Sequence, residues 1–156
     1  MTVCALAAAL WAFQFLDPPP MTVQANPDTV RVGEHVRLVA SVPVAGGHTL
    51  FFPDTLVRVG PVETRKPARW SVTGVRGDTS YVRVTYTLAV YRPGVTHLPP
   101  IPVVIRNRPP GDETRAERLD GGGFVGQWAD LPRVPDFSFV RTAIEGPVIY
   151  TAPTLL

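Results

Sequence analysis

Residues 80–91 read SYVRVTYTLAVY, and this alternation of apolar and polar side chains is the strongest structural signal in the chain. Successive side chains of an extended strand point to opposite faces, so a period of two indicates a strand with one buried face. The apolar face would carry Val82, Val84, Tyr86, Leu88 and Val90. The opposite face would carry Tyr81, Arg83, Thr85, Thr87 and Tyr91. No helical period explains both sets, so we expect a long, half-buried strand here.

The same pattern recurs in shorter runs between residues 21 and 106. Residues 35–42 alternate, and their apolar side chains again fall on a single face. Turn signals such as Gly33-Glu34 and Arg92-Pro93-Gly94 separate the runs. Short strands divided in this way are typical of an antiparallel sandwich. We therefore predict an all-β fold, an immunoglobulin-like antiparallel β-sandwich of about seven strands, over residues 21–106.

Composition supports sheet over helix and excludes several classes of protein. The chain of 156 residues contains 18 prolines and 13 glycines, and helices accommodate neither residue well. Cys4 is the single cysteine, which excludes a disulfide scaffold and a cysteine-based zinc site. The formal net charge is only +2, with scattered arginines, so nothing here indicates a nucleic-acid-binding protein.

Two motifs carry a resemblance to a known family. Gly33-Glu34-x-Val36-x-Leu38 lies early in the predicted domain, and Tyr86-x-Leu88 leads through Pro93-Gly94 to the run Leu98-Pro99-Pro100-Ile101-Pro102-Val103. This arrangement, over about residues 21–106, resembles the N-terminal Ig-like domains of BatD-like proteins. The resemblance implies a bacterial envelope protein associated with oxygen tolerance and with von Willebrand-type partner proteins. It implies no catalytic residues.

The N-terminal segment, residues 1–20, is expected to be a signal peptide or a membrane anchor. Residues 3–16 (VCALAAALWAFQFL) are almost wholly apolar, have about the length of a signal-peptide core, and precede Asp17-Pro18-Pro19-Pro20. A buried N-terminal helix is the alternative. We therefore expect an exported protein, either periplasmic or anchored in the membrane by this segment and facing the periplasm. BatD-like proteins usually carry a later anchor, whereas no apolar span follows residue 106 here, so any anchor would be this segment.

The C-terminal part, residues 107–156, changes in character. Arg108-Pro109-Pro110-Gly111 indicates a linker, and Gly121-Gly122-Gly123 disfavours regular structure. We expect a Pro/Gly-rich linker and an irregular tail. The alternatives are a segment that adds a strand to a sheet, through residues 137–144 or 148–151, and an incomplete reading frame.

No group of residues indicates catalysis. His35, His48 and His97 lie in or beside separate turns and lack the spacing of a metal site. The serines have no nucleophile-elbow context, and no P-loop lysine follows the glycines. We therefore expect no enzyme activity, no cofactor, no metal ion and no small-molecule substrate.

The interpretation that remains is a binding module. Arg37, Tyr81, Arg83 and Tyr91 would share a solvent-exposed face, and Tyr and Arg are enriched in binding hot spots. Ordinary cross-strand packing explains the same residues. We expect a non-catalytic module that binds another envelope protein. The alternative is a sandwich that binds a carbohydrate or surface polymer, which would require an exposed Trp70, although its alternation places Trp70 inward beside Tyr86 in an aromatic core.

Overall fold

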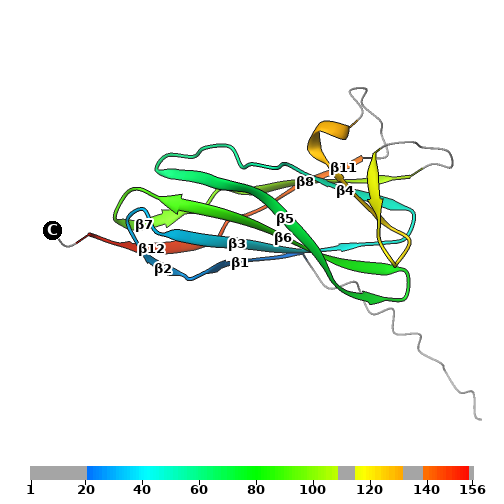
Figure 1. Ribbon diagram of the computed structural model, residues 1–156, viewed down its shortest axis with the longest axis horizontal. Coiled ribbons are helices and arrows are strands. Elements are labelled where there is room, and N and C mark those ends of the chain that lie inside the picture. Colours follow the sequence, from blue (N-terminus) through cyan, green and yellow to red (C-terminus); the bar gives the residue numbers. More distant parts are fainter. Residues whose placement is uncertain (1–20, 109–114, 132–138, 155–156) are drawn as a thin grey trace, which may run out of the picture.

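The structure is a computed structural model that describes residues 21–108, 115–131 and 139–154. Within these ranges the regular structure consists of twelve strands and one short 3-10 helix, η1 (Trp128–Asp130). The strands form three sheets, and antiparallel pairs predominate (Figure 1). The all-β prediction is confirmed. Eight strands, β1 to β8, lie between Thr22 and Asn107, close to the about seven expected there, and four more follow in the described chain.

The largest strand pair forms the centre of a four-stranded antiparallel sheet, with the order β1-β3-β6-β5. Its members are β1 (Thr22–Asn26), β3 (His35–Val44), β5 (Val62–Arg76) and β6 (Thr79–Val90). β3 and β6 pair in unbroken register from His35 opposite Ala89 to Val44 opposite Ser80. Because directly opposite residues share a face, the alternating apolar side chains of the two strands, from Val36 opposite Leu88 to Val42 opposite Val82, lie on the same inner surface.

A five-stranded sheet has the order β11-β8-β4-β10-β9. Its members are β4 (His48–Phe52), β8 (Ile101–Asn107), β9 (Ala116–Arg118), β10 (Phe124–Gln127) and β11 (Phe139–Ile144). β10 runs parallel to β4, while the other pairs are antiparallel. A three-stranded sheet, β2-β12-β7, contains β2 (Thr29–Arg31), β7 (Gly94–His97) and β12 (Val148–Ala152).

One cluster of buried apolar side chains joins the three sheets. The inner face of β6 contributes side chains with no exposed surface, namely Val82, Val84, Tyr86, Leu88 and Val90. Leu50 and Phe52 of β4 belong to the same cluster, as does Ile149 of β12. Burial of this apolar surface is the dominant stabilising contribution to such a fold.

The prediction of an irregular C-terminal tail is wrong. Four of the strands, β9 to β12, lie after residue 107, and both proposed strand segments of that region are used. β11 pairs with β8 from Phe139 opposite Arg106 to Ile144 opposite Ile101. Arg106, the expected end of the domain, therefore lies within a paired strand, and its side chain is buried. These strands have three to six residues each and pair with distant segments, so their pattern is too short to show a period.

Two pairs of consecutive strands, β7–β8 and β11–β12, bend at the same place in the fold. β7 continues into β8 after residues 98–100, and β11 continues into β12 after residues 145–147. β12 pairs with β7 while β11 pairs with β8, so the two bends lie side by side. There the backbone N–H of Leu98 donates a hydrogen bond to the carbonyl of Pro147 at 3.0 Å. Gly146 stands so close to the Leu98 carbonyl that this position has no room for a side chain.

The expected N-terminal helix, signal peptide or anchor of residues 1–20 lies outside the described residues. Within the described part of the chain, no helix has the length and apolar character needed to cross a membrane.

Candidate functional site

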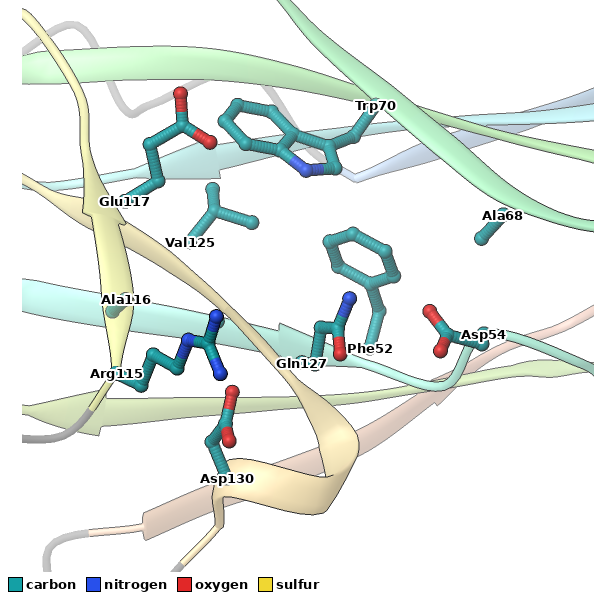
Figure 2. A pocket seen from close by; sticks show the side chains of 11 residues that line it. Phe52, Asp54, Ala68, Trp70, Arg115, Ala116, Glu117, Val125, Gln127 and Asp130 are labelled. Atoms are coloured by element: carbon teal, nitrogen blue, oxygen red, sulfur yellow. The ribbon is translucent and has the colours of Figure 1, made fainter.

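A cleft of about 570 Å³ lies where an edge strand of one sheet meets the edge of another (Figure 2). β5 is the edge of the four-stranded sheet, and β9 is the edge of the five-stranded sheet, with β10 next to it. Six side chains from these elements and their neighbours determine its chemistry: Phe52, Asp54, Trp70, Arg115, Glu117 and Asp130. Its volume falls within the range of about 300–1,000 Å³ that is usual for small-ligand pockets.

The position of the cleft depends on a backbone contact between the sheets. The N–H of Ala68 in β5 donates a hydrogen bond to the carbonyl of Asp54, just after β4, at 2.7 Å. This bond joins the two sheets at the end of the cleft that Ala68 and Asp54 line. Beyond it, β5 continues past Trp70, and the space between Trp70 and β10 is left open.

Two aromatic rings form the apolar part of the cleft. Phe52 is only 2% exposed and belongs to the core cluster, whereas Trp70 is partly buried and packs against that cluster. Trp70 pairs with Val84 of β6, so it faces inward as the alternation predicts. It is nevertheless not a fully buried core residue, because β5 is an edge strand among the described residues. The fully or almost fully buried aromatic side chains of the core cluster are Tyr86 and Phe52 instead.

The charged groups of the cleft are mostly carboxylates. Among the described residues, Asp54, Glu117 and Asp130 line it, together with one cation, Arg115. Figure 2 shows the side chains of Arg115 and Asp130 pointing toward one another, while Glu117 lies on the Trp70 side and Asp54 on the Ala68 side. The cleft is therefore acidic, although the formal net charge of the chain is +2.

Tyr86 supports the corner from which Asp54 projects. Its hydroxyl donates a hydrogen bond to the carbonyl of Pro53 at 2.7 Å, and the side chain has no exposed surface. Burial, and to a smaller extent the negative charge of Asp54, raise the pKa of Tyr86 well above its ordinary value of 10.0. The phenol consequently stays protonated and remains a hydrogen-bond donor across the whole neutral range.

We expect Tyr86→Phe to lower the free energy of unfolding by about 1–3 kcal/mol at pH 8, because it leaves the Pro53 carbonyl without this donor. Above pH 10 the unfolded wild-type chain loses the Tyr86 proton before the folded chain does. Wild-type stability then falls with pH by up to about 1.4 kcal/mol per unit from this group. The difference between wild type and variant should therefore shrink between pH 10 and 11. Urea unfolding of both proteins at pH 8, 10 and 11 measures this difference in unfolding free energy. A difference that stays constant with pH would contradict a buried, hydrogen-bonded Tyr86 hydroxyl.

An apolar strip on β5 continues from the cleft. Val72 is opposite Val82 and Val75 is opposite Ser80, so both face inward like Trp70. Their partners on β6 are fully buried, yet Val72 is 37% and Val75 is 45% exposed. Within the part of the chain that the structure describes, β5 is thus a sheet edge with partly exposed apolar side chains, which is uncommon on an isolated domain unless something binds there.

Three of the four residues expected to form a binding surface share one face. Arg37, Tyr81 and Arg83 point outward from the four-stranded sheet, on the side opposite the core. Arg37 is opposite Thr87 and Ser41 is opposite Arg83, so the two arginines stand about 13 Å apart along the strands. Tyr81 is partly buried beside Pro43, whereas both arginines are exposed.

Tyr91 does not join them. β6 ends at Val90, and both Ala89 and Val90 are fully buried, so the alternation stops before Tyr91. The Tyr91 backbone N–H donates a hydrogen bond to the carbonyl of Pro61 at 3.0 Å, and the ring lies beside Gly33. Tyr91 therefore lies at the far end of the molecule from Tyr81.

Sequence reasoning missed the cleft. Its polar side chains come from segments around residues 54, 117 and 130, which share no motif and meet only through the pairing of β10 with β4. The one available signal was Trp70, whose exposure was the open question. In the described ranges, no three His, Cys, Asp or Glu side chains are grouped so that they could hold a metal ion.

Comparison with known proteins identifies no relative. No protein-family model matches the chain, and searches of curated proteins and of solved structures found no significant match.

Proposed function

We propose that this chain is a non-catalytic, immunoglobulin-like module of the bacterial cell envelope that binds another envelope protein along edge strand β5. The architecture in this proposal is a sandwich, and its support is the antiparallel sheet β1-β3-β6-β5 with a core shared with the other two sheets. The motifs that resemble BatD-like proteins support the envelope setting and a role connected with oxygen tolerance. The apolar segment of residues 3–16 supports export to the periplasm, free or anchored.

The observation that carries the binding role is the uncovered inner face of β5. Val72 and Val75 expose apolar surface on a strand that has a paired neighbour on one side only among the described residues. A partner segment lying along this edge would cover both side chains and continue into the cleft beside Trp70. The first half of β5 carries Lys66, Pro67 and two register shifts, whereas the second half has one shift, between Val72 and Gly74, so docking is expected along the second half.

We expect a negative charge on this strip to weaken partner capture. The full chain, immobilised and exposed to envelope extract, should retain a specific protein that Val72→Asp and Val75→Asp each retain about tenfold less, because the charge would be buried in the interface. Val148→Asp is the matched control, since Val148 is 49% exposed on β12, far from β5. A partner retained equally by all the variants would refute docking along β5.

A further inference from the structure

The cleft beside β5 combines two features that select for one kind of ligand. Trp70 presents an aromatic ring that is not covered by the core, and Phe52 closes the base. The electron-rich face of an indole attracts cations, and among aromatic side chains tryptophan binds them best. A neutral ring system would stack equally well on Trp70, so the aromatic surface alone does not decide the ligand.

The charges around the Trp70 ring determine which kind of ligand the cleft selects. Asp54 and Glu117 line the cleft on two sides of the aromatic pair, while Asp130 faces Arg115 (Figure 2). Among the described lining residues Arg115 is the one cation, and its side chain points toward Asp130 rather than toward Asp54 or Glu117. An apolar side chain would leave both carboxylates without hydrogen-bond donors when it displaced water, and a neutral sugar would supply hydroxyl donors but no opposite charge. An organic cation would supply both.

We infer that the cleft binds an organic cation, namely the ammonium or guanidinium end of a lysine or arginine side chain on the partner protein. The identity of that partner rests on the proposed function, but binding of the cation by the cleft does not. A partner segment lying on Val72 and Val75 would carry its basic side chain toward Trp70, since the strip and the ring share one face of β5. The apolar strip would hold the segment, and the cleft would select its sequence.

The probe for this site is n-butylguanidinium, with n-butanol as its neutral counterpart. Titrated into the full-length ¹⁵N-labelled chain, the cation should shift the indole N–H signal of Trp70, and n-butanol should not. Asp54→Asn and Glu117→Gln should each weaken cation binding by about two- to fivefold, and added salt should weaken it further. Glu145→Gln is the control, because Glu145 is an exposed carboxylate that does not line the cleft.

Three results would overturn the inference: no shift of Trp70 with the cation, an equal shift with n-butanol, or a shift with a neutral oligosaccharide alone. The last would assign the cleft to a carbohydrate. The experiment is independent of partner capture. If n-butylguanidinium still binds but Val72→Asp does not change partner retention, docking along β5 is refuted and the cation site stands.

Discussion

A chain that ends at Arg106 should not fold. This truncation removes β9 to β12, and with them Leu119, Val125, Ile144 and Ile149 of the core cluster. Each of these side chains contributes about 1.5–3 kcal/mol by its burial. Their combined loss approaches the about 5–15 kcal/mol that separates folded from unfolded states of ordinary domains. The truncated chain should show a poorly dispersed NMR spectrum and no cooperative thermal transition.

The lost strands also occupy structural positions that nothing else fills. β12 is the central strand of its sheet and holds β2 and β7 together, and β10 separates β4 from β9. A chain that ends at Pro153 is the matched control, because it keeps every strand up to Ala152 and should unfold like the full chain. Cooperative unfolding of the chain ending at Arg106 would show that residues 21–106 are a self-sufficient unit and would refute the prediction.

The largest effect of a single substitution is expected at Gly146. A Cβ there would overlap the carbonyl oxygen of Leu98, and it would stand 2.6 Å from the Leu98 carbonyl carbon and 2.7 Å from the carbonyl oxygen of Pro99. These are backbone atoms at the joint bend of two strand pairs, so they cannot turn aside as a flexible side chain would. We expect Gly146→Ala to cost about 3 kcal/mol, near the upper end of typical overpacking penalties. The melting temperature should fall by roughly 6–12 °C.

Gly74 provides the control for this substitution. It lies on strand β5, where a Cβ at Gly74 would meet no atom within 4 Å. Gly74→Ala should therefore leave the melting temperature unchanged or raise it slightly, because alanine reduces the freedom of the unfolded chain. Equal melting temperatures for Gly146→Ala and wild type would mean that the two bends are not packed as described.

The long strands could be predicted from sequence because their information is local. In β3 and β6 the inward-facing apolar residues recur at every second position, and the burial pattern follows this period as far as Leu88. The prediction extended the pattern one residue too far, to Tyr91. Tertiary context explains the difference, since Ala89 and Val90 are both buried where the strand approaches β5 and the loop before it.

The last third of the chain could not be predicted in the same way. Val125, Ile144 and Ile149 are separated by glycines, prolines and turns, and no window of sequence shows them to be core residues. Their burial depends on partners 40 or more residues away in most cases, as in the pairing of β12 with β2. The cleft also depends on long-range pairing. Trp70 was recognised from the sequence as a candidate, whereas Glu117 and Asp130 line the cleft only because distant strands pair.

The central place of β12 affects the order in which the fold can form. A chain is synthesised from its N-terminus, and β12 (Val148–Ala152) comes after both of its partners, β2 and β7, in the sequence. Until it emerges, β2 and β7 have no common partner, and their open edges are exposed to other chains. Pairing of segments so distant in sequence is also intrinsically slow. Newly made molecules therefore pass through an interval in which aggregation competes with completion of the sheet, and a holding chaperone would raise the yield of folded protein during that interval.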